Sequence, residues 1–580
     1  MSEQAQKPKF EIGLVMAGAV SAGAYTAGVI DFLLQALDAW YGAAGDLFPD
    51  GNPHEVKIKV MSGASAGGMT AALAASVAAH ELQPVTQVPP AGPVHNKLYE
   101  CWVDRIDISH LLQDRDLARA GSPVVSVLDG SVLDDIANYA FSEDGSRRQR
   151  PYFDDALHVL LSVTNLRGVP YGIRFDGGAG GRHELSLHAD YMHFIVDSGG
   201  AQDETPGALR LDAHDLDGPG WAALKEAALA SGAFPIGLPP RVLQRRHTDY
   251  DARTWSVPMT SQPTAEGAIQ QLVKAAIPPR WPPDMAAASA VAESAAASSA
   301  AATMSEAAAD YAFLSVDGGL MDNEPLELAR SVLAQGGSNP REGAAASQAV
   351  IMVDPFPDVV PFSSYYKPNP SLISVAAQMF SGLRHQAMFK LDELALAYAS
   401  DVYSRFLIAP SRATEGRQPT LACGSLGAFG GFFSRRFRQH DFRLGRRNCQ
   451  RFLVKYFRLP ENNPLFAGWG DDLRAKYRIE ENGQTFLPII PLLGDLQEPE
   501  ELLPWPRIPR AEVSALGEQI QHRLDVLLRR LLPSGSLVKF AAQLAWYLRL
   551  RRVALEKVMA YILADFEEND LLQPAPEQQG

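Results

Sequence analysis

The sequence predicts an α/β fold with a mostly parallel central sheet, followed by a mainly α-helical C-terminal region. The first observation is a strand, a sharp turn and a helix within residues 56–79. The second is that strand patterns alternate with helical patterns up to about residue 356. The third is helical periodicity farther on, in 372–403, 519–532 and 537–566. The expected strands are 10–16, 56–61, 156–164, 171–175, 185–187, 311–316 and 349–353, and the expected earlier helices are 25–36 and 221–231.

Composition and charge narrow the class of protein. The chain has 580 residues, of which 46% are hydrophobic and 21% charged, so it can bury a large core. Its formal net charge of −15 argues against nucleic acid as a partner. Cys101, Cys423 and Cys449 lie far apart, with neither a metal-ligand spacing nor a disulfide framework. We therefore expect a reducing compartment and a cytoplasmic location.

The N-terminal segment could be mistaken for a membrane span. Residues 1–9 are polar, do not resemble a signal peptide and are expected to be disordered. Residues 12–30 carry no charge and are long enough to cross a bilayer. Four glycines interrupt the stretch, at Gly13, Gly18, Gly23 and Gly28. This pattern favours a buried strand, a Gly/Ala loop and a helix that begins near Gly23.

The turn between the strand and the helix of 56–79 contains the best candidate nucleophile. Gly63-Ala64-Ser65-Ala66-Gly67 is a G-x-S-x-G string, placed after alternating apolar residues and before an Ala-rich helix. Such an elbow holds its serine at a strained backbone position with the hydroxyl exposed at the end of a strand. The alternative is an ordinary Gly/Ala/Ser turn, because the string by itself is common.

Asp317 is the best candidate for the base that would activate this serine. It follows an apolar strand, and Gly318 and Gly319 permit a sharp turn and a close approach there. An aspartate within hydrogen-bond reach of a serine hydroxyl can take its proton. The alternative is an ordinary Asp-Gly-Gly turn. The histidines offer no clear partner: His158 lies within a strand pattern, and the spacing of His183, His188 and His193 does not suit a metal site.

Acyl transfer also requires donors for the oxyanion. Gly18, Ala19 and Val20 lie in the loop between the first strand and its helix, where backbone N–H groups can converge. One such donor is typically worth about 3 kcal/mol of transition-state stabilisation. The alternative is a loop of small residues that serves only packing.

Taken together, these motifs resemble the patatin-like phospholipase family. The Ser65 motif (Gly63 to Gly67) and Asp317-Gly318-Gly319 match in full and in the right order, and 228–235 with 238–240 resembles a third block. The resemblance covers about residues 10–356. It implies a three-layer α/β catalytic domain at 10–360, with an Ala-rich insertion at 285–309, and a helical region at 361–580. It also implies a Ser65–Asp317 dyad that uses no histidine, metal or organic cofactor.

The first motif departs from this family. The usual pattern has three glycines and then a basic residue, whereas this chain has Gly18-Ala19-Val20 and places Ala22 at the basic position. Backbone donors do not need glycine, so the loop can still supply N–H groups. We hypothesise that another residue compensates for the missing cation.

An arginine-rich segment leaves two interpretations open. Residues 432–458 contain eight arginines and one lysine against one acid, with aromatic residues interleaved. The segment could dock on an anionic membrane or bind a phosphate head group. Alternatively, its arginines pair with the surplus carboxylates of the chain while its aromatics enter the core, which is the interpretation we favour.

These observations predict a lipid acyl hydrolase that cleaves esters of phospholipids or other glycerolipids through an acyl-enzyme. Its expected partners are a lipid substrate and, transiently, a membrane surface, so that the protein is cytoplasmic or peripheral; the sequence leaves the oligomeric state open. Two alternatives remain. One is a catalytically weak lipid-binding or scaffold protein on the same fold, and the other is a small-ester α/β-hydrolase with a histidine-containing triad.

Overall fold

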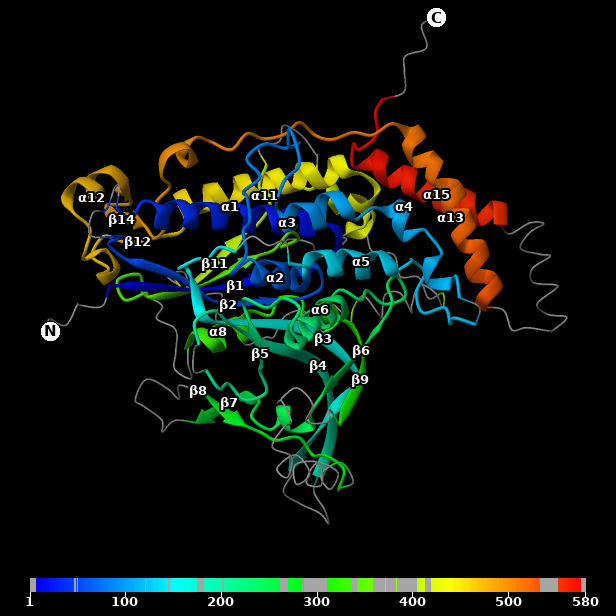
Figure 1. The fold of residues 1–580 in the computed structure, drawn as a ribbon, viewed down its shortest axis with the longest axis horizontal. Coiled ribbons are helices and arrows are strands. Elements are labelled where there is room, and N and C mark those ends of the chain that lie inside the picture. The colour runs from blue at the N-terminus through cyan, green and yellow to red at the C-terminus, as the bar shows by residue number, and fades with distance from the viewer. Residues whose placement is uncertain are drawn as a thin grey trace, which may run out of the picture.

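The computed structural model describes most of the chain between residues 7 and 574 (Figure 1). Outside the described residues are 1–6, 46–47, 49–50, 120, 144–146, 175–181, 201–202, 261–269, 284, 286–309, 335–341, 358–370, 372–381, 383–403, 413–418, 532–550 and 575–580. The predicted disordered N-terminus, the Ala-rich insertion and the predicted helix at 372–403 therefore lie wholly or mostly outside them.

A mixed, mostly parallel sheet forms the centre of the molecule. Its strands run in the order β11-β10-β1-β2-β3-β4-β5, and β9 pairs with both β3 and β6. The pairings of β1 with β10 and β2, of β10 with β11, of β2 with β3 and of β4 with β5 are parallel. Those of β3 with β4 and β9, and of β6 with β9, are antiparallel. The strands are β1 Lys9–Met16, β2 Glu55–Gly63, β3 Phe153–Arg174, β4 Arg182–Asp197, β5 Leu209–Asp212, β6 Arg241–Arg245, β9 Tyr311–Asp317, β10 Gln348–Val353 and β11 Arg405–Ile408.

Helices cover both faces of this sheet (Figure 1). On one face, α2 packs on β1 and β2, and Ile12, Leu14 and Met16 of β1 lie in the main core with α1 residues. On the other, α8 forms a smaller cluster with strand residues such as Val15 and Val60. Side chains alternate between faces along a strand, so β1 contributes to both layers. The helices are α1 Gly23–Gly42, α2 Ala66–Ser76, α3 Lys97–Tyr99, the π-helix η2 Glu100–Arg105, α4 Ile108–Leu111, α5 Ser131–Ala140, α6 Pro219–Ser231, α8 Leu326–Ala334, α11 Arg435–Lys455, α12 Asp471–Tyr477, α13 Arg510–Leu531 and α15 Arg551–Glu568.

The α/β class and the mostly parallel sheet predicted from the sequence are confirmed, with corrections in detail. Strands β5 and β6 were not predicted, and β4, expected at 185–187, spans Arg182–Asp197. The strands expected at 156–164 and 171–175 are one strand, β3, whose pairing with β4 shifts register between Thr164 and Val169. The sequence also missed an antiparallel ribbon of β7 Thr254–Thr260 and β8 Gln270–Ala276.

The region after residue 360 is mainly helical, as expected, but it also contributes strands. β11 extends the central sheet beside β10. A small antiparallel sheet has the order β12-β14-β13, with β12 Arg458–Pro460, β13 Ile479–Glu481 and β14 Gln484–Pro488. Residues on both sides of position 360 enter the same hydrophobic core, as Phe10 and Phe457 illustrate with ring centroids 5.8 Å apart.

The arginine-rich segment forms α11, which lies along α1 (Figure 1). A side chain at Gly28 would overlap the carbonyl of Phe442, so the two helices approach closely there. Arg446 is buried between Asp31, with which it forms an ion pair, and Glu500, whose carboxylate lies 2.8 Å away. Arg438 and Arg443 also pair with carboxylates, as the favoured interpretation expected, and the buried Arg438 and Arg446 cannot reach a membrane surface.

The apolar N-terminal segment is a strand, a loop and a helix, as predicted. The helical stretch Val20–Gly42 is long and apolar enough to cross a membrane by length and composition alone. Of its most apolar window, 89% is buried inside the protein. A helix covered in this way is typical of a protein core. Here α1 packs against α11 and α2, and the Tyr41 hydroxyl donates to the Val56 carbonyl of β2.

Candidate active site

Ser65 lies on a sharp elbow between β2, which ends at Gly63, and α2, which begins at Ala66. Its φ of 53° and ψ of −127° are strained for a residue with a side chain, at a typical cost of about 1–3 kcal/mol. A side chain at Gly67 would overlap the backbone of Met16, and one at Gly63 would come within 2.5 Å of the Gly67 carbonyl carbon. The glycines of the motif are therefore required by close backbone packing.

Ser65 and Asp317 are in direct contact, although 252 residues separate them in the chain. The Ser65 hydroxyl donates a hydrogen bond of 2.7 Å from Oγ to Oδ2 of Asp317. Both residues are buried, with exposed fractions of 7% and 5%. Strand β3 brings them together, because Gly63 at the end of β2 pairs with Leu161 and Asp317 at the end of β9 pairs with Val163.

The surroundings of Asp317 fix its side chain. Oδ1 accepts a hydrogen bond of 2.7 Å from the N–H of Gly319, and the Asp317 carbonyl accepts one of 2.8 Å from the Thr164 hydroxyl. A side chain at Gly318 would overlap the backbone of Ser162. The predicted Asp-Gly-Gly motif is thus a turn that orients a carboxylate toward Ser65.

The predicted oxyanion loop lies beside the nucleophile. A Cβ atom at Gly18 would lie 3.2 Å from Cβ of Ser65. The Gly18 N–H, however, donates to the carbonyl of Asn323 over 3.2 Å. The N–H groups of Ala19 and Val20 donate to no acceptor within the described residues, and Val20 has a positive φ of 48°. Of the three predicted donors, Ala19 and Val20 are therefore the ones left for a ligand.

Two further residues, to which the sequence analysis assigned no role, shape the site. Ala66 follows the nucleophile as the first residue of α2, so its N–H has no acceptor within the helix. Ser231, at the end of α6, accepts a hydrogen bond of 3.0 Å from the N–H of Ser65. The position after the nucleophile of a G-x-S-x-G elbow is a sequence signal for Ala66. For Ser231, the signal was only its place in the block 228–235.

Ala22 stands where the resembled family has a basic residue, and it is fully buried. Its loop instead contacts the C-terminal region: the hydroxyl of the adjacent Ser21 donates to the carbonyl of Ala428 over 2.5 Å and accepts from the N–H of Gly431 over 3.0 Å. The loop is thus hydrogen-bonded to residues 428 and 431 of the C-terminal region.

The histidines lie in other environments. His158 and His193 are buried on neighbouring strands with ring nitrogens 2.9 Å apart, and Nε2 of His158 lies 3.1 Å from Asp203. Burial, reinforced by His158, lowers the pKa of His193 to about 3. His188 lies 2.7 Å from the carbonyl of Asn165. Within the described residues, no histidine hydrogen-bonds to the Ser65 hydroxyl, and no group of His, Cys, Asp and Glu side chains could hold a metal ion.

Comparison with known proteins gives one close relative. No protein-family model matches the chain. "Uncharacterized protein y4iI" of Sinorhizobium fredii is 36% identical over 571 residues, which cover 90% of this chain and 76% of that protein. The crystal structure of VipD from Legionella pneumophila aligns over 98% of this chain and 89% of its own, with 11% identity and a TM-score of 0.24. That score is too low to carry any argument about fold or activity.

Proposed function

The chain belongs to the family of the y4iI protein, and we propose that it is a serine acyl hydrolase in which Ser65 and Asp317 form the catalytic dyad. The observation that carries the proposal is the 2.7 Å hydrogen bond from the Ser65 hydroxyl to Oδ2 of Asp317, formed at a strained strand–helix elbow. Strain retained at such a position is typical of functional sites. A hydroxyl bonded to a carboxylate has a base in position to take its proton.

The first half of the reaction forms an acyl-enzyme. Ser65 Oγ attacks the ester carbonyl carbon as Asp317 takes the hydroxyl proton, and the carbonyl oxygen becomes an oxyanion. The N–H groups of Ala19, Val20 and Ala66 are the donors that would stabilise it, helped by the N-terminus of α2. When the intermediate collapses, the carbon–oxygen bond of the ester breaks and the departing alcohol takes the proton from Asp317.

The second half regenerates the enzyme. Asp317 takes a proton from water, and the resulting hydroxide attacks the acyl-enzyme carbonyl. Collapse of this second intermediate releases the carboxylic acid, and Ser65 recovers its proton from Asp317. All proton transfers therefore use one carboxylate, so that the mechanism requires neither a histidine nor a cofactor.

The proposed substrate is an ester of a phospholipid or another glycerolipid. The order of the Gly18 loop, the Ser65 motif and the Asp317 motif supports this class, because it resembles the patatin-like phospholipases and their three-layer fold. The three described cysteines are buried and free, in keeping with the proposed cytoplasmic location. Contact with a lipid surface would then be transient and peripheral, and the net charge of −15 disfavours nucleic acid as a partner.

The test compares the wild type with Ser65→Ala, using Ser142→Ala as the matched control because Ser142 is exposed. A fluorophosphonate probe should label the wild type and the control but not Ser65→Ala. Mass spectrometry of a mixed lipid extract should show released fatty acids and lysolipids with the wild type and the control, but not with Ser65→Ala. Equal product formation by purified, folded Ser65→Ala would exclude the assignment.

One observation favours a second candidate, a catalytically weak lipid-binding protein. The N–H of Gly18 donates to Asn323, so the loop offers fewer oxyanion donors than its sequence suggests. This candidate predicts saturable binding of lipid vesicles without labelling of Ser65 by the probe. The histidine-triad alternative predicts instead that one histidine substitution removes activity as completely as Asp317→Ala.

A further inference from the structure

The oxyanion loop contains a backbone conformation that its own sequence disfavours. Val20 has a φ of 48°, a rare value for a residue whose side chain branches at the β-carbon. Such a conformation persists only where the surrounding structure imposes it. Val20 supplies one of the two N–H groups left for an oxyanion, so the contacts that impose this φ also determine where that N–H group lies.

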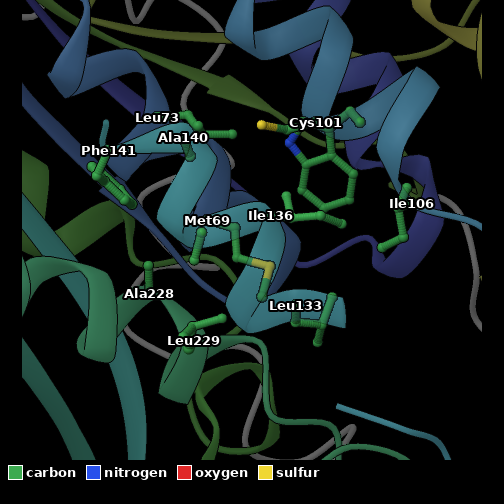
Figure 2. A pocket seen from close by; sticks show the side chains of 12 residues that line it. Met69, Leu73, Cys101, Ile106, Leu133, Ile136, Ala140, Phe141, Ala228 and Leu229 are labelled. Carbon is green, nitrogen blue, oxygen red and sulfur yellow. The ribbon is translucent and has the colours of Figure 1, made fainter. Parts of the chain in front are cut away.

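On one side, the end of the loop packs against an apolar wall. Gly23, directly after the loop, lies so close to Trp102 that a Cβ atom there would be 2.5 Å from the ring. Trp102 lines the cavity of about 60 Å³ that Figure 2 shows, whose walls carry no charged, hydroxyl or amide side chain. Contacts on this side therefore restrain the loop by packing.

Ser21, the residue after Val20, connects the loop to the C-terminal region. Its hydroxyl donates to the Ala428 carbonyl over 2.5 Å and accepts from the Gly431 N–H over 3.0 Å. Ser21 is fully buried, whereas Val20 is half-buried. A Cβ atom at Gly431 would lie 2.5 Å from the Ser21 oxygen, so only glycine fits there. One side chain thus bonds the loop to backbone groups 407 and 410 residues later in the chain.

Helix α11 holds segment 421–433, which contains both partners of this serine. Arg438 donates to the carbonyl of Gly431 over 2.7 Å. The Asp441 carboxylate accepts a hydrogen bond of 2.8 Å from the N–H of Cys423. Arg438 and Asp441 are almost completely buried, and hydrogen bonds to charged groups are stronger than those between neutral groups. The segment is therefore a fixed support.

Helix α15 holds the same segment at the turn that leads to Ala428. Leu426 and Ala428 have φ values of 52° and 74°, which are strained for residues with side chains. The Leu426 N–H donates to Oδ1 of Asp565 over 2.9 Å. A chain of contacts therefore runs from α15 through this turn and Ser21 to the oxyanion loop.

We propose that Ser21 is a positioning residue of the reaction, which keeps the N–H groups of Ala19 and Val20 directed toward the oxyanion. It does so through segment 421–433 and the helices that hold it, so that a part of the C-terminal region becomes necessary for catalysis. The inference rests on the proposed function, because it assigns a role in the acyl transfer by Ser65. Donors that are already fixed stabilise an oxyanion more than donors that must first be ordered.

The first experiment measures kcat and KM of Ser21→Ala for p-nitrophenyl butyrate, with active sites counted by complete fluorophosphonate labelling of Ser65. We expect kcat per labelled site to fall about a hundredfold, a typical cost of a lost oxyanion donor, while KM stays nearly constant. The matched control is Ser76→Ala, which removes a buried hydroxyl bonded to the Leu73 carbonyl in its own helix. An unchanged kcat per labelled site in Ser21→Ala would overturn the inference.

A transition-state mimic separates positioning from loss of structure. A trifluoromethyl ketone forms a tetrahedral oxyanion with the nucleophilic serine, so its inhibition constant depends on the donors that act in the transition state. In Ser21→Ala this constant should rise by about the factor by which kcat/KM falls. A merely structural role would reduce the number of labelled sites and leave the inhibition constant of the remaining sites unchanged, which would contradict the proposal.

Asp565→Ala tests the far end of the chain of contacts, and it decides the question if circular dichroism shows that Ser21→Ala does not fold. Asp565 is half-buried, and kcat should fall about threefold to tenfold when its bond to Leu426 is lost. Glu556→Ala is the matched control, since Glu556 is an exposed carboxylate on the same helix. A kcat equal to that of the wild type in Asp565→Ala would overturn the chain of contacts as a support for catalysis.

The double variant Ser21→Ala/Asp565→Ala tests whether the two residues act in series. If Asp565 acts through Ser21, then Asp565→Ala should have little further effect on kcat once the Ser21 hydroxyl is absent. Full additivity of the two effects would show that Asp565 acts by another route and would contradict the proposal.

These outcomes also separate the inference from the proposed function. If Ser65→Ala retains full ester hydrolysis, the proposed function fails and the inference fails with it. If Ser65 is essential but Ser21→Ala and Asp565→Ala retain the kcat of the wild type, the proposed function stands and only the inference is wrong.

Discussion

Two buried carboxylates of this protein have opposite environments. Asp31 on α1 is fully buried, forms an ion pair with Arg446 and accepts a hydrogen bond of 2.6 Å from Asn96. Asp317 is also buried, but its two oxygens accept hydrogen bonds from the Ser65 hydroxyl and the Gly319 N–H. An arginine cannot yield a proton to its partner at ordinary pH, whereas an attacking hydroxyl must yield one. The first carboxylate is thus suited to stabilise the fold, and the second to accept a proton.

The largest expected effect is on activity, in Asp317→Asn. The amide retains the size of the side chain but cannot take the Ser65 proton, so we expect kcat to fall about a thousandfold or more. The free energy of unfolding should change by only about 1 kcal/mol, because the hydrogen bonds can largely be retained. Ester kinetics together with urea unfolding test this, with the exposed Asp472→Asn as control. If Asp317→Asn greatly lowers the free energy of unfolding but preserves kcat, Asp317 serves the stability of the fold and not proton transfer.

The Asp31 site predicts the opposite outcome in Arg446→Met. This change retains most of the side-chain volume but leaves two buried carboxylates, Asp31 and Glu500, without the guanidinium between them. We expect a loss of about 3–5 kcal/mol in unfolding free energy, with kcat per folded molecule retained. Arg436→Met on the same helix is the control, because Arg436 is exposed and should contribute less than about 1 kcal/mol. Similar losses in both variants would remove the distinction between buried and exposed arginines.

A third buried group makes stability depend on pH. His54 lies 2.9 Å from the carbonyl of Ile489 through Nε2, and Nδ1 accepts a hydrogen bond of 2.9 Å from the Trp469 indole. Burial lowers the pKa of His54 from 6.5 to about 4, although the Ile489 carbonyl opposes the shift. The neutral ring fits because protonation of Nδ1 would break the bond from Trp469.

The lowered pKa of His54 determines whether the protein gains or loses stability as the pH falls. Between pH 6.5 and about 4 the unfolded chain binds a proton at His54 that the folded chain does not, so the free energy of unfolding falls as the pH falls. The loss attributable to His54 is about 3 kcal/mol. Urea unfolding across this interval should therefore show a weaker pH dependence in His54→Phe than in the wild type. An identical pH dependence in the two proteins would show that His54 does not titrate in this way.

Local motifs explain why the contact between Ser65 and Asp317 could be predicted from the sequence. Backbone crowding demands glycine at Gly63, Gly67 and Gly318, so the sharp turns leave a visible pattern beside Ser65 and Asp317. Strands β1, β9 and β10 were predictable because they are short, mostly apolar stretches, and β2 because its apolar residues alternate with lysines.

Contacts between distant segments explain what the sequence could not reveal. Asp31 and Arg446 are 415 residues apart, and no local spacing connects them. The Gly18 N–H is occupied by the carbonyl of Asn323, and any residue type could supply that carbonyl. The continuous strand β3 was divided in the prediction because Asn165-Leu166-Arg167-Gly168 resembles a turn, whereas it lies at a register shift within the β3–β4 pair.

The smallest predicted effect concerns Ser231, which acts on the dyad only through the backbone of Ser65. Its hydroxyl oxygen accepts the Ser65 N–H at 3.0 Å, so Ser231→Ala leaves that N–H without this acceptor and loosens the elbow. We expect kcat to fall about tenfold, in line with the sensitivity of catalysis to small misplacements, while KM stays nearly constant. Ser76→Ala is the matched control, since Ser76 is also buried but bonds to the Leu73 carbonyl in its own helix, away from the elbow. If the role of Ser231 is purely structural, Ser231→Ala should lower the free energy of unfolding, as Ser76→Ala does, and leave kcat per folded molecule unchanged.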